Sequence, residues 1–238
     1  MSALLEIRDL VGGYEKGQNI LEGVDLKVLT AEAVGVIGLN GSGKSTLVKA
    51  MMNIIPYRQG TVFFDGQDVH DKNTHELAQM GMAILHQGGT VFPNLSVWQN
   101  LSLAWGNNPD QEYRSRLEQI IPILHQPQRE LTRVMSDRLS GGQRHELALA
   151  MTLARKPKLI ILDEPSAGLS PKTMEEMYAM LAAVRNWTGM AFVIVEQNIS
   201  NAVAFCDRCV MLGQGKIIHE FVKNDACLTD IENIMFKN

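Results

Sequence analysis

Residues 38–46 of this 238-residue chain, GLNGSGKST, combine glycines with a lysine and a serine at a spacing that can bind phosphate. Glycines let backbone N–H groups surround phosphate oxygens, Lys44 adds a positive charge, and Ser45 offers a hydroxyl oxygen to a Mg²⁺ ion. A strand-like apolar run precedes the loop and a segment with helical apolar spacing follows it, which disfavours an ordinary turn with an incidental lysine. The candidate phosphate-binding residues are Gly38, Asn40, Gly41, Ser42, Gly43, Lys44, Ser45 and Thr46.

Two adjacent carboxylates, Asp163 and Glu164, end the apolar run in LIILDEP. Hydrolysis of a nucleoside triphosphate needs one carboxylate near the Mg²⁺ ion and a second that orients the attacking water and accepts its proton. A buried strand that ends in solvated acids is common by itself, but the phosphate loop in the same chain makes that explanation weak. We therefore expect Asp163 at the metal and Glu164 as the catalytic residue.

A second glycine-rich segment, LSGGQ, lies almost a hundred residues after the phosphate loop. Ser140 and Gln143 have the spacing of a capping box, which satisfies the first N–H groups of a helix. A cap alone does not require Gly141 and Gly142 in the first turn, where each glycine costs up to about 1 kcal/mol relative to alanine. The segment therefore predicts a second anion site, at the start of a helix.

These segments lie within a pattern of alternating strands and helices, which predicts an α/β fold with a mostly parallel, covered sheet. Residues 88–156 differ, because they contain helical segments and no convincing strand. We expect this stretch to be a helical insertion in a core formed by residues 1–87 and 157–238. A short helix is expected over residues 225–236.

Composition limits the partners of the chain. The net charge of -4 and the absence of a block of Lys or Arg exclude the electrostatic surface of a nucleic-acid binder. No run approaches the ~18 apolar residues that a membrane helix needs, and an acid at Glu6 precedes any apolar stretch of signal length. We expect a cytoplasmic chain in which Cys206, Cys209 and Cys227 are reduced, the first two as buried apolar residues.

The order of these motifs resembles that of the ATP-binding cassette (ABC) ATPases, whose signature motif is LSGGQ. The resemblance covers nearly the whole chain and adds Tyr14, at the adenine-stacking position, and Gln87, which follows the core and contacts Mg²⁺ or the attacking water. It implies a RecA-like P-loop NTPase core with an antiparallel β subdomain and an inserted helical subdomain. ATP and Mg²⁺ are the implied ligands. Two cassettes of that family dimerise head to tail, so Ser140, Gly141, Gly142 and Gln143 are expected to serve the ATP of a partner.

The sequence departs from the family pattern at two positions. Gln197 occupies the position that is usually a histidine, and its amide can donate a hydrogen bond to phosphate but cannot become cationic. Ser170 replaces a usual aspartate, and with Pro171 it is expected to cap the next helix. The segments VEQN and SAGLSP resemble the ATPases of branched-chain amino acid importers and their urea or amide relatives, which pair two non-identical cassettes.

The resemblance implies the ATPase subunit of a membrane importer, bound peripherally at the inner face of the cell membrane to transmembrane permease subunits. Val91, Phe92 and Leu95 either receive a cytoplasmic helix of the permease or pack the helical subdomain. A soluble ABC ATPase acting on DNA or ribosomes is disfavoured, because such proteins carry a long coiled coil or two fused cassettes and this chain is acidic. A nucleotide kinase would have no use for LSGGQ.

Overall fold

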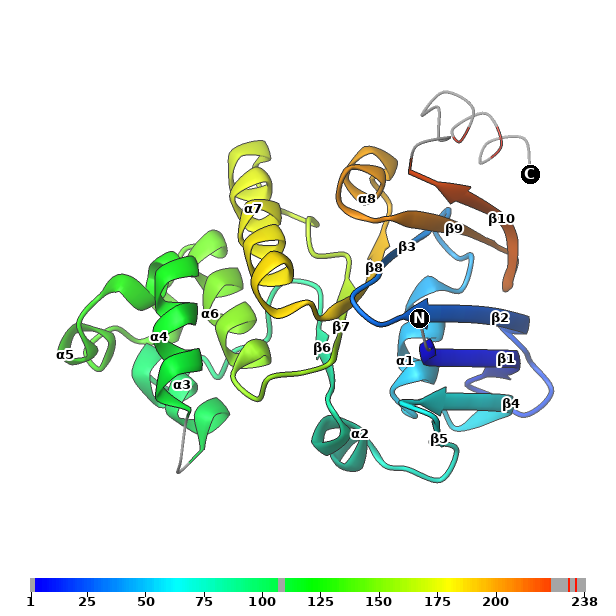
Figure 1. The fold of residues 1–238 in the computed structure, drawn as a ribbon, viewed down its shortest axis with the longest axis horizontal. Helices are drawn as coiled ribbons and strands as arrows, with labels where there is room; N and C mark the ends of the chain where they lie inside the picture. The colour runs from blue at the N-terminus through cyan, green and yellow to red at the C-terminus, as the bar shows by residue number, and fades with distance from the viewer. Residues whose placement is uncertain (1–2, 107–109, 224–230, 232–233, 235–238) are drawn as a thin grey trace.

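The computed structural model describes residues 3–106, 110–223, 231 and 234. Its centre is a six-stranded sheet in the order β10-β9-β3-β8-β7-β6, in which all pairs except β9–β10 are parallel (Figure 1). The prediction of an α/β fold with a mostly parallel sheet is confirmed. The strands are β3 (Ala33–Ile37), β6 (Met82–Leu85), β7 (Leu159–Asp163), β8 (Ala191–Glu196), β9 (Arg208–Gly213) and β10 (Lys216–Val222).

A second sheet is antiparallel and has the order β2-β1-β4-β5. It lies beside helix α1 (Lys44–Met51) on the other side of the molecule from the helical region (Figure 1). This sheet is the antiparallel β subdomain that the resemblance implied. Its strands are β1 (Ala3–Gly13), β2 (Leu21–Leu29), β4 (Tyr57–Phe64) and β5 (Gln67–Asp68).

Strand β8 shows how the central sheet is buried on both faces. Phe192 and Ile194 point into a core shared with the helical region. Ala191, Val193 and Val195 point into a second core, which contains α1 and the antiparallel sheet. Because successive side chains of a strand alternate between faces, a continuous apolar run is what a sheet covered on both sides requires.

Residues 88–156 contain helices and, in their described part, no β-strand (Figure 1). The buried Asn100 organises the start of this region, since its amide bonds the backbone N–H and C=O of Phe92 and donates to the Ser136 hydroxyl at 2.9 Å. The helices are α3 (Val97–Trp105), α4 (Gln111–Ile120), α5 (Gln128–Leu131) and α6 (Gly141–Leu153), with 3₁₀ turns at Pro122–His125 and Ser136–Arg138.

The remaining helices are α2 (Thr74–Met80), α7 (Pro171–Thr188) and α8 (Ile199–Phe205). Helix α7 begins as predicted, because Ser170 is its N-cap and accepts the Thr173 N–H. The sequence reading missed α2.

Cys206 and Cys209 are buried free thiols, as expected. Cys227 and most of the helix expected over 225–236 lie outside the described residues. Within the described ranges, no helix combines the length and the apolar character needed to cross a membrane.

Candidate functional site

Most of the predicted site residues, but not Tyr14 or the LSGGQ segment, lie at one edge of the central sheet. Strands β3, β8, β7 and β6 are neighbours in that order and run parallel, so the segments that follow them meet at their shared carboxyl ends. These segments are the phosphate loop, Gln197, the pair Asp163 and Glu164, and Gln87. Ligands of open parallel sheets bind at this edge, where the backbone turns away from the strands.

Lys44 holds the phosphate loop around its own ammonium group. Its Nζ atom donates to the carbonyl oxygens of Gly38 at 2.8 Å and Leu39 at 3.0 Å. The side chain is only 5% exposed, and this burial lowers the pKa of Lys44 although the charges of Glu164 and other carboxylates oppose the shift. Gly43 precedes the helix with φ at 105°, a conformation that favours glycine. A phosphate ligand can therefore replace two internal carbonyl contacts of Lys44.

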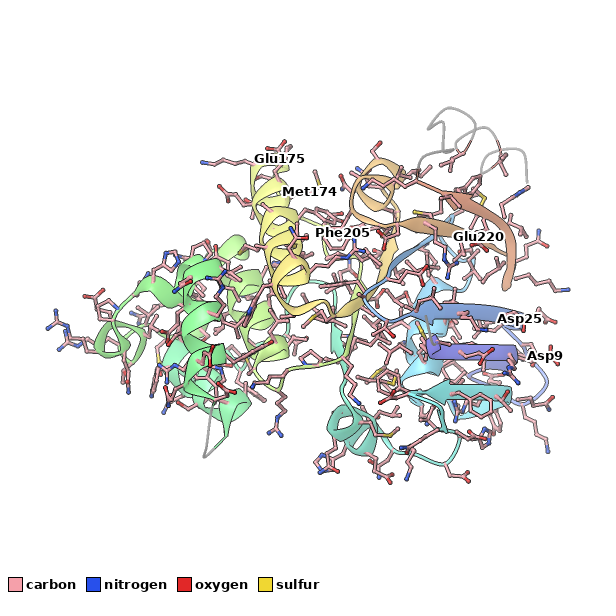
Figure 2. The ribbon with its side chains drawn as sticks, viewed as in Figure 1. Asp9, Asp25, Met174, Glu175, Phe205 and Glu220 are labelled. Carbon is pink, nitrogen blue, oxygen red and sulfur yellow. The ribbon has the colours of Figure 1, made fainter. Side chains whose placement is uncertain are left out.

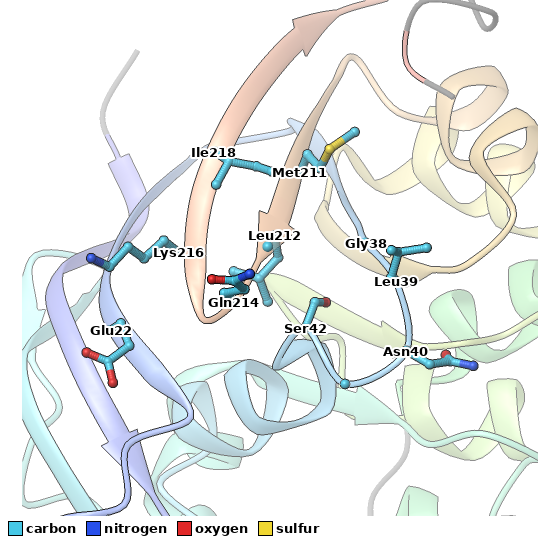
Figure 3. A pocket seen from close by; sticks show the side chains of 12 residues that line it. Glu22, Gly38, Leu39, Asn40, Ser42, Met211, Leu212, Gln214, Lys216 and Ile218 are labelled. Atoms are coloured by element: carbon cyan, nitrogen blue, oxygen red, sulfur yellow. The ribbon is translucent and has the colours of Figure 1, made fainter. Parts of the chain in front are cut away.

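The phosphate loop packs against the β9–β10 hairpin. A Cβ atom at Gly38 would lie 2.3 Å from the Leu212 carbonyl oxygen, so this glycine is required by packing as well as by the ligand. Gly215 in the hairpin turn donates its N–H to the Ser42 carbonyl at 3.0 Å and accepts the N–H of Glu22 at 2.9 Å. Beside these contacts, the loop and the hairpin together line a cavity of about 610 Å³ (Figure 3).

That cavity adjoins the predicted phosphate site and differs from it. It is lined by loop residues 38–42 and by the hairpin, whereas Lys44, Ser45 and the two carboxylates at the end of β7 do not line it. Figure 3 shows Ser42 and Asn40 at its floor and Ile218 with Gln214 above them. The phosphate site that we predict is on the other side of the loop, where the charges of Asp163 and Glu164 act on Lys44.

Gln197 and Glu164 are in direct contact. The Gln197 Nε2 atom donates to Glu164 Oε1 at 2.7 Å. Glu164 lies in the left-handed region with φ at 48°, and its N–H donates to the Val195 carbonyl at 2.9 Å. The sharp turn thus directs the Glu164 carboxylate away from β7 and towards Gln197.

Asp163 is a partly buried carboxylate at the end of β7. Its Oδ1 atom is buried and has no hydrogen-bond partner among the residues that the structure describes. Burial raises the pKa of this carboxyl, and the charge of Glu164 adds to the rise while His86 opposes it. A buried, unpartnered carboxylate oxygen is unfavourable unless a cation or a donor binds to it.

The surrounding oxygens fit Mg²⁺, which prefers carboxylate, hydroxyl and phosphate oxygens and keeps several waters. Ser45 and Gln87 are exposed at the same edge of the sheet as Asp163. Across the described residues there is no group of three or more His, Cys, Asp or Glu that could hold a metal ion. A cation here would depend on the phosphates of the nucleotide for its remaining ligands.

Tyr14 follows β1 and lies beside α1. Its ring is 42% exposed, and Lys49 of α1 places its Nζ atom 3.1 Å from the phenol oxygen and 5.1 Å from the ring centre. An exposed aromatic ring next to the phosphate-loop helix suits the stacking of a base. Lys49 is a neighbour of this site that the sequence reading did not single out.

The LSGGQ segment forms the predicted capping box. Ser140 Oγ accepts the Gln143 N–H at 3.2 Å, and Gln143 Oε1 accepts the Ser140 N–H at 3.1 Å. A Cβ atom at Gly142 would lie 2.8 Å from Thr173 Cγ2, so this glycine has a packing reason within the chain. A Cβ atom at Gly141 would meet nothing within 4 Å, so packing within the chain leaves this glycine unexplained.

The structure does not bring LSGGQ to the phosphate loop of the same chain. Helix α6 lies among α3 and α4, apart from α1 (Figure 1). The exposed start of α6 therefore faces outward, as a site completed by a second molecule would require.

The sequence reading missed Glu196, the last residue of β8. This carboxylate is 2% exposed and accepts hydrogen bonds from the Ser166 N–H and the Tyr178 hydroxyl. The available signal was an acidic residue at the end of an otherwise apolar strand, because such a residue needs internal partners when it is buried.

Comparison with known proteins decides the family. A sequence model of the family described as ABC transporter matches residues 21–167. The chain is also 32% identical to the probable branched-chain amino acid transport ATP-binding protein LivF of Archaeoglobus fulgidus, over 93% of each chain. The chain belongs to the ABC transporter family.

A further relative and a solved structure are similar to this chain over most of its length. The lipopolysaccharide export ATP-binding protein LptB of Escherichia coli strain K12 is 31% identical over 91% of this chain and 89% of its own. The dimeric cassette MJ0796, solved after hydrolysis with ADP and phosphate bound, superposes with a TM-score of 0.78 at 25% identity, over 92% of this chain and 98% of that one. This chain is accordingly an ABC ATPase of a transporter, and it binds and hydrolyses ATP.

Proposed function

We propose that this cassette is the energy-coupling subunit of an importer for branched-chain or related amino acids. The similarity to LivF and the segments VEQN and SAGLSP support this substrate class. Export of a lipid-linked saccharide is the second candidate, because LptB is almost as similar to this chain as LivF is. An importer of urea or amides remains a related alternative.

The contact between Gln197 and Glu164 is the observation that supports the proposed roles of these residues in hydrolysis. Glu164 accepts the proton of the attacking water, and the Gln197 amide fixes the carboxylate and can donate to a γ-phosphate oxygen. Lys44 exchanges its contacts with loop carbonyls for phosphate oxygens. A bound Mg²⁺ held by Asp163, Ser45 and Gln87 would neutralise charge on the phosphates.

A second cassette would supply the missing side of the site. The N–H groups at Gly141 and the Ser140 hydroxyl lie at an exposed helix start, where a partner's phosphates would be favoured by the helix dipole. Because Gln197 cannot act as an imidazole, we propose a non-identical partner that carries a histidine at the equivalent position.

The segment after Gln87 is the proposed docking surface for a permease helix. Phe92 is 54% exposed although Asn100 fixes its backbone, whereas Val91 packs partly against the helical core and Leu95 is half-buried. A held backbone with an exposed aromatic side chain suits a protein contact. Docking there would place the cassette on the inner face of the cell membrane.

Reconstitution tests the proposed transport. The cassette is purified with its membrane partners, placed in lipid vesicles, and assayed for ATP hydrolysis with leucine and valine plus the cognate binding protein, with urea, or with lipopolysaccharide. We expect branched-chain amino acids to stimulate hydrolysis and to accumulate in an ATP-dependent way. Stimulation by lipopolysaccharide without amino acid uptake would transfer the proposal to the export candidate.

A further inference from the structure

Glu196 holds together three segments next to the hydrolytic site. Its Oε1 atom accepts the Ser166 N–H at 3.1 Å and the Tyr178 hydroxyl at 2.9 Å, and its Oε2 atom accepts the Gln197 N–H at 3.2 Å. At 2% exposure this carboxylate has given up nearly all of its contact with water. Burial of a charge at this level is costly, and donors on several sides offset the cost.

The partners of Glu196 lie on both sides of the Glu164–Gln197 contact. Ser166 is two residues after Glu164, in a turn closed by the Ala167 N–H donating to the Glu164 carbonyl at 3.1 Å. The Gln197 N–H follows directly on Glu196, and the Gln197 side chain returns to Glu164 at 2.7 Å. One buried carboxylate thus fixes the backbone on both sides of that hydrogen bond.

Tyr178 anchors this arrangement to helix α7. Burial and the charge of Glu196 raise the pKa of the Tyr178 phenol, so this residue remains a neutral O–H donor. The centre of its ring lies 5.8 Å from that of Phe205, the residue of α8 labelled in Figure 2. Phe205 in turn packs edge-on against Phe192, with 5.4 Å between the ring centres. The phenol is therefore held in place by packing, and its hydroxyl has a fixed direction towards Glu196.

We propose that Glu196 is a positioning residue for ATP hydrolysis, which aligns Glu164 with Gln197 by fixing the Ser166 turn and the Gln197 backbone on one carboxylate. The inference rests on the roles proposed above for Glu164 and Gln197. Glu196 itself faces its protein partners and acts on the reaction through them. Its charge also reaches the site directly, since Glu196 is one of the carboxylates that favour the charged form of Lys44.

Two variants separate the positioning role from general stability. Glu196→Gln keeps the shape of the side chain, replaces charge-assisted bonds by neutral ones, and leaves one oxygen for three donors. Tyr178→Phe keeps the carboxylate and removes one donor. Glu32→Gln is the matched control, because the Glu32 carboxylate accepts the Leu29 N–H and Arg208 Nε at 2.7 Å each, is 13% exposed, and lies before β3 at the opposite end of the sheet.

The measurements are kcat and KM for ATP, the Kd of a fluorescent ATP analogue, and urea unfolding. We expect Glu196→Gln to lower kcat roughly ten- to a hundredfold, because small displacements of reacting groups are costly, with KM and Kd changed less than about twofold. Tyr178→Phe should lower kcat less. Glu32→Gln should weaken the fold and leave kcat unchanged.

The outcomes distinguish this inference from the proposed function. A normal kcat in Glu196→Gln would overturn the inference, as would parallel losses of kcat, Kd and stability like those of a weakened fold. If Glu196→Gln does not fold, a normal kcat in Tyr178→Phe would overturn it and a reduced kcat at normal Kd would support it. Glu164→Gln is assayed alongside. Full activity of Glu164→Gln would contradict the proposed role of Glu164 in hydrolysis. If Glu164→Gln is inactive while Glu196→Gln is fully active, the proposed role of Glu164 stands and only the inference about Glu196 is overturned.

Discussion

Gly141→Ala should make the isolated chain more stable and at the same time slow its hydrolysis. The stability change follows from the structure, because a Cβ atom at this position meets nothing within 4 Å and Gly141 begins helix α6. Alanine in place of an unstrained glycine reduces the freedom of the unfolded chain and stabilises by about 0.4–1 kcal/mol. For a chain of this size that corresponds to a rise in Tm of roughly 1–4 °C, measurable by calorimetry.

The activity change follows from the proposed partner site. A methyl group at Gly141 would occupy the space through which the phosphates of the second cassette approach the backbone. Loss of one hydrogen bond between a backbone N–H and a charged phosphate costs about 1.5–3 kcal/mol, which corresponds to roughly a 10- to 100-fold lower rate. ATP binding to the single chain should not change, because in the proposed arrangement Gly141 contacts the nucleotide held by the other cassette.

Gly142→Ala is the matched control for this prediction. Its Cβ atom would lie 2.8 Å from Thr173 Cγ2, so one of the two must move and the gain in stability should be absent. The assay is steady-state ATP hydrolysis of the assembled cassettes, beside the Kd of ATP for the single chain. A stabilised Gly141→Ala variant with normal hydrolysis would refute the partner site, and a destabilised one would refute the inference that the space is open.

Gln197→Ala should lower kcat about tenfold, the cost of one exposed hydrogen bond to a carboxylate, and a loss below about twofold would contradict the role of the amide. Gln197→His should make the rate of hydrolysis fall as the pH decreases through about 6.5, because an imidazolium at position 197 pairs with Glu164 and lowers the basicity of that carboxylate. A pH–rate profile like that of the wild type would argue against this contact. Asp163→Asn without nucleotide or metal should be more stable than the wild type in urea at about pH 8. Burial raises the pKa of Asp163 in the folded chain, so the wild type loses stability as the pH rises through that pKa, and the difference should disappear below the ordinary value of 3.8. Glu164→Gln with Mg-ATP should remain a monomer by light scattering if the partner is non-identical, whereas a stable dimer would count against an unlike partner.

The sequence predicted the elements whose apolar pattern is long or whose ends are marked. Helix α7 has a serine cap, a proline in its first turn and eighteen residues, and its start at Ser170 and Pro171 was predicted correctly. Helix α2 was missed because its only buried residue is Leu77, so no apolar periodicity is present. Its capping box from Asn73 to Glu76 and its terminal Gly81 were a usable signal of a helix.

The sequence predicted which candidate site residues come together where a motif fixes both residue type and spacing. The phosphate loop, Asp163 and Glu164 follow buried strands, and parallel strands necessarily bring such residues to one edge. The bonds of Lys44 to its own loop could not be predicted, since they depend on backbone carbonyls. Glu196 was also not predictable as a partner of Tyr178, because the two are 18 positions apart, with the rest of α7, a turn and strand β8 between them, and only the packing of α7 brings them together.

The amide at Gln197 changes the charge balance of the site as well as its hydrogen bonding. Asp163, Glu164 and Glu196 all favour the charged form of Lys44, and a protonated histidine in place of Gln197 would add a second cation to this group. A neutral amide holds Glu164 in position and adds no positive charge to the site. The negative charge of the phosphates would then be neutralised by Lys44, by a bound cation and by the start of α6 in the second cassette. Hydrolysis in this cassette should therefore depend more strongly on the closure of the second cassette than it would with a histidine, and this dependence is the physical argument for the unlike partner proposed above.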